Sequence, residues 1–95
     1  MDKISIKKMK LHFLSPSKTI YDGDIESVTI PGTKGLFTVW DKHAPLLTTM
    51  TKGTVVFRTA NNNEKEVHVS GGFTEVKDNV VTICIEKVID KEATD

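Results

Sequence analysis

The sequence predicts an all-β protein, a single antiparallel β-sandwich of about ten strands. Between Lys10 and Glu86 the chain consists of short runs rich in β-branched and aromatic residues, the composition typical of strands. Gly, Pro, Asn and Asp, which favour turns, separate these runs at short intervals. Within several runs apolar and polar residues alternate, as expected when one face of a strand is buried. No segment shows a convincing helical pattern.

The turn signals divide the chain into about eight to ten strands, the spacing found in sandwiches. They are Ser15-Pro16-Ser17, Asp22-Gly23-Asp24, Pro31-Gly32-Thr33-Lys34-Gly35, Lys52-Gly53, Asn61-Asn62-Asn63, Gly71-Gly72 and Lys77-Asp78-Asn79. We expect the glycine pair 71–72 to form a turn or bulge, because glycine tolerates positive φ and close backbone approach.

Alternation also predicts which residues face the core. The inward rows are Val55 and Phe57, Val67 and Val69, and Val81, Ile83 and Ile85. Two sheets packed face to face would bury these rows together. Cys84 lies on the opposite side of its strand and is expected to be a small, interfacial side chain.

Length and charge exclude several classes of protein. A chain of 95 residues forms one domain with a modest core. We expect an N-terminal extension over residues 1–9, a sandwich over 10–86 and a short charged tail over 87–95. Lys plus Arg and Asp plus Glu both count 13, so the formal net charge is zero. A nucleic-acid partner is therefore not expected, because such partners select for a basic surface.

A single cysteine, Cys84, excludes an internal disulfide and favours a reducing, cytoplasmic setting. The N-terminal residues 1–10 contain neither the apolar stretch of a signal peptide nor a span long enough to cross a bilayer. Any association with a membrane is expected to occur through another protein.

The residues do not predict catalysis or a cofactor. His12, His43 and His68 lack the local spacing of metal ligands, so no metal site is expected. A hydrolase built on His68 and Ser70 is the least favoured hypothesis. Side chains two positions apart on a strand are about 7 Å apart, beyond hydrogen-bond reach.

Two stretches, residues 31–37 and 43–47, are the most distinctive. The first is either a plain hairpin turn, with Leu36 and Phe37 entering opposite faces, or a loop that presents apolar surface to a partner. The second, together with Trp40, is either an edge segment or a contact patch. The alternative function is a free-standing β-sandwich module that binds a peptide or saccharide through Trp40.

These stretches resemble the N-terminal domain of the ATP synthase epsilon subunit, and the resemblance extends from Met9 to Glu86. In order, the matching blocks are Asp22-Gly23, Glu26 to Gly35, His43 to Thr48, Lys52-Gly53, Val69 to Val76 and Asn79 to Thr82. The resemblance implies a ten-stranded β-sandwich. It also implies a non-catalytic central-stalk subunit of a proton-translocating F-type ATP synthase, peripheral on the cytoplasmic face of the bacterial inner membrane. Such a subunit couples the gamma subunit to the c-subunit ring during ATP synthesis.

The resemblance also implies two interfaces. The c-ring side comprises Thr33, Lys34, Gly35, Leu36 and Phe37, and the gamma side comprises Ser15, Trp40, His43, Ala44, Pro45, Leu46, Leu47 and Thr48. This chain departs from the family pattern by carrying Leu36 where an acidic residue is frequent, Thr38 where Gly is frequent, and Asp41-Lys42 where Pro-Gly is frequent. The ring side is therefore expected to be less acidic than in many relatives. Longer relatives continue into a two-helix hairpin that can inhibit ATP hydrolysis, and this chain is expected to be a short form without it.

Overall fold

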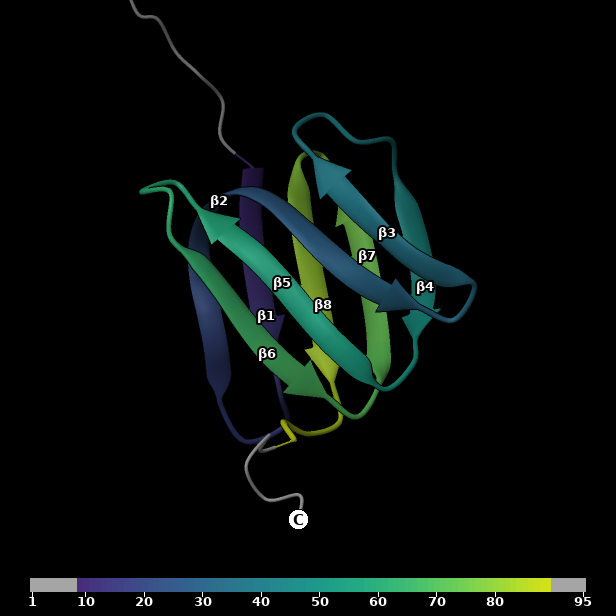
Figure 1. Cartoon of the computed structure of the whole chain (residues 1–95). Coiled ribbons are helices and arrows are strands. Elements are labelled where there is room, and N and C mark those ends of the chain that lie inside the picture. Colours follow the sequence, from purple (N-terminus) through teal and green to yellow (C-terminus); the bar gives the residue numbers. More distant parts are fainter. Residues whose placement is uncertain (1–8, 90–95) are drawn as a thin grey trace, which may run out of the picture.

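The computed structural model describes residues 9–89, which form eight strands in two layers (Figure 1). The strands are β1 (Met9–Leu14), β2 (Thr19–Gly32), β3 (Gly35–Trp40), β4 (Leu46–Met50), β5 (Gly53–Thr59), β6 (Glu64–Val69), β7 (Gly72–Lys77) and β8 (Val80–Ile85). This confirms the predicted all-β class. Over residues 9–89 there is no helix with the length and apolar character needed to traverse a membrane.

Strand β2 belongs to both layers. Its first half pairs with β1 in the rear sheet of Figure 1, which continues through β8 and β7 to β4. Its second half lies in the front sheet between β3 and β5, and β6 follows β5. The pairing with β5 shifts register between Ile25 and Ser27, an irregularity of the kind that bends a strand. The two sheets are thus connected through one continuous strand.

The strand count and one pairing differ from the expectation. The segment Asp22-Gly23-Asp24, predicted as a turn, lies inside the 14-residue β2. There Asp22 and Asp24 face His12 and Lys10 of β1, with nitrogen–oxygen distances of 3.1 and 3.3 Å. Pairing with the preceding strand thus keeps turn-forming residues extended. In addition, β1 and β8 run parallel, so the described sandwich is not purely antiparallel.

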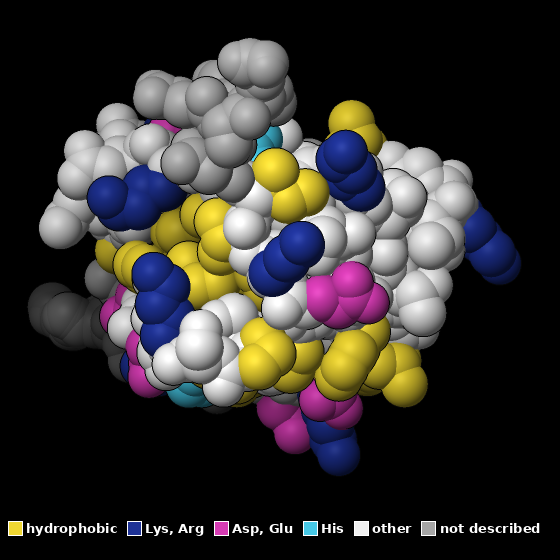
Figure 2. Space-filling view, turned by 90° about the horizontal axis from the view of Figure 1, so that it is seen from below, with side chains coloured by type: hydrophobic (Ala, Val, Ile, Leu, Met, Phe, Trp, Pro, Cys, Tyr) yellow, Lys and Arg dark blue, Asp and Glu magenta, His cyan; other side chains and the backbone are white. Residues whose placement is uncertain are grey.

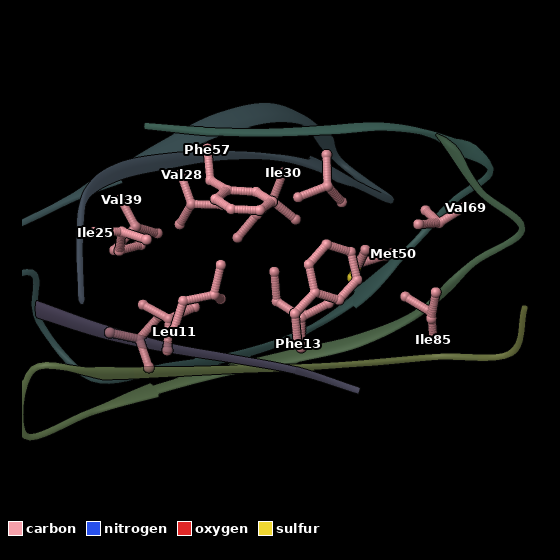
Figure 3. Packing of buried hydrophobic residues seen from close by; sticks show 14 of the residues in the cluster. Leu11, Phe13, Ile25, Val28, Ile30, Val39, Met50, Phe57, Val69 and Ile85 are labelled. Atoms are coloured by element: carbon pink, nitrogen blue, oxygen red, sulfur yellow. The ribbon is translucent and has the colours of Figure 1, made fainter. Parts of the chain in front are cut away.

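The core lies between the two sheets and is formed by the rows that alternation predicts. Val55, Phe57, Val69, Val81, Ile83 and Ile85 are all buried, and Val67 is half-buried against them. Figure 3 shows side chains from both layers meeting in this space. Cys84 lies on the other side of β8, as alternation predicted, and is half-exposed.

Three aromatic rings connect the layers across the core. The Phe13 ring from the rear sheet packs edge-on against Phe57 of the front sheet, with ring centroids 6.1 Å apart. The Tyr21 ring lies closer to Phe57, with ring centroids 4.8 Å apart. Burying a phenylalanine side chain fully stabilises a fold by about 1.5–3 kcal/mol. Phe57 is therefore a principal contact between the sheets.

Both ends of the described chain join the sandwich. Met9, assigned from the sequence to the N-terminal extension, is a buried residue of β1. After β8, Val88 forms a bridge with Val69, and the Ile89 N–H donates to the His68 carbonyl oxygen at 2.7 Å. The remainder of the expected extension (residues 1–8) and of the expected tail (90–95) lies outside the described residues.

The glycine pair at the start of β7 allows the close backbone approach that the sequence suggested. Gly71 and Gly72 have φ values of 141° and 148°. A Cβ on Gly72 would lie 2.0 Å from the Cys84 carbonyl oxygen. Only glycine fits here, because any side chain would separate β7 from β8.

We expect Gly72→Ala to lower the free energy of unfolding by about 2–4 kcal/mol, from backbone strain together with overpacking. Gly35→Ala is the matched control, because Gly35 has a φ of 128° but no atom within 4 Å of an added Cβ. It should cost about 1–2 kcal/mol, from strain alone. Urea unfolding followed by far-UV circular dichroism measures both. Equal losses in the two variants would show that the contact with Cys84 contributes nothing.

Candidate docking surfaces

The tip of the β2–β3 hairpin, residues 33–37, projects from the right side of the sandwich in Figure 1. Lys34 lies in its turn and is exposed. Leu36 is 73% exposed on the outer face of the front sheet. Phe37 points the other way and packs against the core. Of the two bulky apolar residues that the sequence suggested here, only Leu36 is presented to solvent.

The base of this tip is attached to the rear sheet. The Thr33 N–H donates to the Thr49 carbonyl oxygen at 3.1 Å, and the Thr51 N–H donates to the Pro31 carbonyl oxygen at 2.9 Å. The hydroxyl oxygens of Thr33 and Thr49 are 3.0 Å apart. Bending the hairpin relative to the rear sheet would break these bonds, so the tip is held as part of the sandwich.

An open groove lies beside the tip on the front sheet. Its volume is about 500 Å³, and its lining includes Pro31, Leu36, Lys52 and Val56. The lining is largely apolar, with Lys52 as its charged residue. The groove widens the apolar surface that Leu36 presents.

The residues expected on the gamma side do not all face solvent, because some of their side chains are exposed and others pack against the core. Trp40 is 61% exposed at the end of β3. Leu46 packs against the core, whereas its neighbour Leu47 is 71% exposed on the outer face of the rear sheet. Thr48 is half-buried. Leu47 and Trp40 are therefore the large side chains of this set that are available for contact, and they belong to different sheets.

The β3–β4 loop, residues 41–45, crosses between these two strands at the upper end of the sandwich in Figure 1. Ala44 and Pro45 are exposed, and His43 is half-buried. The His43 N–H donates to the Trp40 carbonyl oxygen at 3.1 Å, closing a turn. The loop thus continues directly from Trp40 to Leu46.

Ser15 lies at the opposite, lower end, in the β1–β2 turn, where its N–H donates to the Lys18 carbonyl oxygen at 2.9 Å. The structure therefore does not bring Ser15 next to the β3–β4 loop. Both nevertheless border the outer face of the rear sheet. In Figure 2, which shows the molecule from below, hydrophobic side chains reach the surface of this lower end between lysine and acidic side chains.

A row of paired residues crosses that outer face from strand to strand near its lower end. Thr49 pairs with Phe73, Phe73 with Cys84, and Cys84 with Leu14. We call Phe73, Cys84 and Leu14 the rear apolar row; Phe73 is 46% exposed. Leu47 lies on the same face of β4, two residues from Thr49. Sequence reasoning missed Phe73 and Leu14, although the outward alternation of Phe73, Glu75 and Lys77 was a usable signal.

The polar residues considered for catalysis form separate local contacts. His68 Nδ1 lies 2.8 Å from the Thr54 hydroxyl oxygen. The Ser70 hydroxyl is placed instead near a Glu86 carboxylate oxygen and the Lys87 carbonyl oxygen, both at 3.4 Å. Ser70 and His68 are therefore not arranged as nucleophile and base. In the part of the chain that the structure describes, no three His, Cys, Asp or Glu residues are grouped as metal ligands would be.

Comparison with solved structures finds the same fold in two ATP synthases. One matching chain comes from the Euglena gracilis mitochondrial ATP synthase, in a structure of OSCP, F1 and the c ring. It has a TM-score of 0.84 and 21% identity, and the match covers all of this chain and 61% of that one. The other comes from the central stalk and c ring of the Tetrahymena thermophila mitochondrial enzyme, with a TM-score of 0.79, 19% identity and coverage of 92% and 69%.

Sequence comparison finds closer relatives among bacteria. The ATP synthase epsilon chain of Leptospira borgpetersenii is 38% identical over 93% of this chain and 68% of its own length. The epsilon chain of Chlorobaculum tepidum is 37% identical over 88% of this chain and 96% of its own length. A family profile described as the β-sandwich domain of the ATP synthase delta/epsilon chain matches residues 8–91. The chain therefore belongs to the ATP synthase delta/epsilon family and forms its β-sandwich domain.

Proposed function

We propose that this protein is a non-catalytic central-stalk subunit of a rotary F-type ATP synthase, linking the gamma subunit to the membrane c ring. Family membership and the fold shared with central-stalk chains support this proposal. The carrying observation is a single rigid sandwich with exposed apolar surfaces on two separate parts, the tip at Leu36 and the outer face at Leu47 and Phe73.

Rigidity is what such a linker needs in order to transmit torque. A close-packed core and paired strands leave few soft degrees of freedom, so force on one surface reaches the other with little deformation. The bonds between residues 31–33 and 49–51 attach the tip directly to β4, whose outer face carries Leu47. The two proposed docking surfaces therefore share a short mechanical connection.

The gamma side of the proposal comprises the β3–β4 loop, Trp40, Leu47 and the rear apolar row up to Ser15. Exposed large apolar side chains concentrate binding energy when a partner covers them. Leu46 and Thr48 would support this surface from within, because both are at least half-buried. The ring side comprises the tip and its groove. Leu36 would provide the apolar contact, and Lys34 would provide a positively charged one.

The proposed location is peripheral, at the cytoplasmic face of the bacterial inner membrane, reached through the complex. Bacterial relatives named as epsilon chains support this setting. Association would depend on protein contacts with gamma and the c ring.

To test the gamma side, we change the exposed pair with Leu47→Asp and Phe73→Asp. The double variant should bind gamma at least about tenfold more weakly, because two buried apolar contacts become charged. Titration of labelled protein with purified gamma subunit measures this. The pair Asn61→Asp and Asn63→Asp, in the exposed β5–β6 turn, is the charge-matched control and should bind normally. Unchanged affinity in the double variant would contradict this placement of gamma.

For the ring side, Leu36→Asp alone is the informative variant, because Phe37 packs into the core and its replacement would weaken the fold. Stability should change by no more than about 0.5 kcal/mol, since Leu36 is exposed. The catalytic sector reconstituted with this variant should sediment with stripped membranes less completely than the wild type does. If the catalytic sector carrying Leu36→Asp attaches to membranes as fully as the sector carrying the Asn61→Asp control, the tip is not part of the ring interface.

A further inference from the structure

One side chain attaches the β3–β4 loop to the β7–β8 turn of the rear sheet, at the same upper end of the sandwich in Figure 1. The Asn79 Nδ2 donates to the Asp41 carboxylate Oδ1 at 2.6 Å, and the Lys42 N–H donates to the Asn79 Oδ1 at 2.7 Å. Asn79 belongs to the β7–β8 turn, 37 and 38 residues from these partners. Within residues 9–89, both hydrogen bonds that tie this loop to a distant segment end on this one amide.

The backbone has positive φ on both sides of this contact. Lys42, Asp78 and Asn79 have φ values of 66°, 53° and 64°. Among the described residues, Asn62 is the only other non-glycine residue with positive φ. Such conformations persist where surrounding contacts hold them, and they gather at functional sites. Asp78 and Asn79 form the two-residue β7–β8 hairpin turn, in which positive φ is ordinary. Lys42 is therefore the residue of this contact whose conformation needs support from its neighbours.

Asn79 also anchors the first strand. Its carbonyl oxygen accepts from the Lys10 N–H at 3.1 Å, at the start of β1. Asn79 thus connects the β7–β8 turn to both the start of β1 and the β3–β4 loop. By contrast, His43 bonds only locally, to Trp40 and to the Ala44 carbonyl oxygen.

We propose that Asn79 is a positioning residue for partner binding: it holds the β3–β4 loop in the orientation that the gamma subunit engages. The choice of gamma as the partner rests on the proposed function, whereas the positioning of the loop rests on the hydrogen bonds of Asn79. An amide suits this position, because its Nδ2 donates to the Asp41 carboxylate while its Oδ1 accepts from the Lys42 N–H. A carboxylate at position 79 could accept only, and it would repel Asp41.

The test is a reciprocal exchange of the two side chains. Asn79→Asp should place two carboxylates against each other and release the loop. Adding Asp41→Asn should restore the contact with its polarity reversed, because the new amide donates to the new carboxylate, whose other oxygen still accepts from Lys42. Asp78→Asn is the matched control, because it changes the neighbouring turn residue and leaves the Asn79 contact in place.

Two measurements separate positioning from general stability. Hydrogen exchange at the Lys42 amide should accelerate at least about tenfold in Asn79→Asp, because repulsion between the two carboxylates separates the loop from the turn and the Lys42 N–H then loses its acceptor. It should return toward wild-type values in the double variant. Affinity for purified gamma should fall and recover in parallel, while far-UV circular dichroism confirms that every variant is folded.

The outcomes are distinct. Unchanged exchange in Asn79→Asp, or no recovery in the double variant, overturns the role of Asn79 whatever gamma does. Faster exchange with unchanged affinity shows that the loop is held by Asn79 but is not what gamma engages, which overturns the positioning role alone. A wild-type protein that fails to bind gamma overturns the proposed function, whereas the exchange data still report on the Asn79 contact. Parallel loss and recovery of both quantities supports the proposal.

Discussion

The structure depends on one long strand that is shared by both sheets. β2 pairs with β1 in the rear sheet, bends where its register with β5 shifts at Ile25–Ser27, and continues between β3 and β5 in the front sheet. Because one backbone spans both layers, the sheets cannot slide apart without breaking its pairing. The same strand ends at Gly32, directly before the hairpin tip. The tip is thus an extension of the element that holds the sandwich together.

The core explains why the outward surfaces are well defined. Phe57 contacts Phe13 and Tyr21 across the two layers, and the β-branched rows around it are buried. Since strand residues alternate between faces, burying one row places its neighbours outside in a fixed register. Leu47 and Phe73 are exposed because Leu46 and Thr74 face inward. The apolar outer surface is therefore a geometric consequence of the core, and a partner that covers it meets a preformed face.

Much of the fold could be predicted from the residues, and the failures have a common cause. Local alternation identified the inward rows, and glycine chemistry identified the close approach at Gly72. The segment Asp22–Asp24 was misassigned because its turn composition is outweighed by pairing with β1, which the turn residues alone do not reveal. Likewise, adjacent Leu46 and Leu47 looked equivalent until the strand boundaries determined which one faces the core.

By itself the sequence determined the all-β class, the core-facing rows and the resemblance to epsilon subunits, because composition, alternation and motif order are local or linear properties of the chain. The tertiary structure alone decided which distant segments meet: Ser15 at one end and the β3–β4 loop at the other, Phe73 beside Cys84, and Asn79 against Asp41 and Lys42. Such contacts follow from strand register and sheet order. These arise from pairing and packing summed over the whole molecule, so no local pattern specifies them.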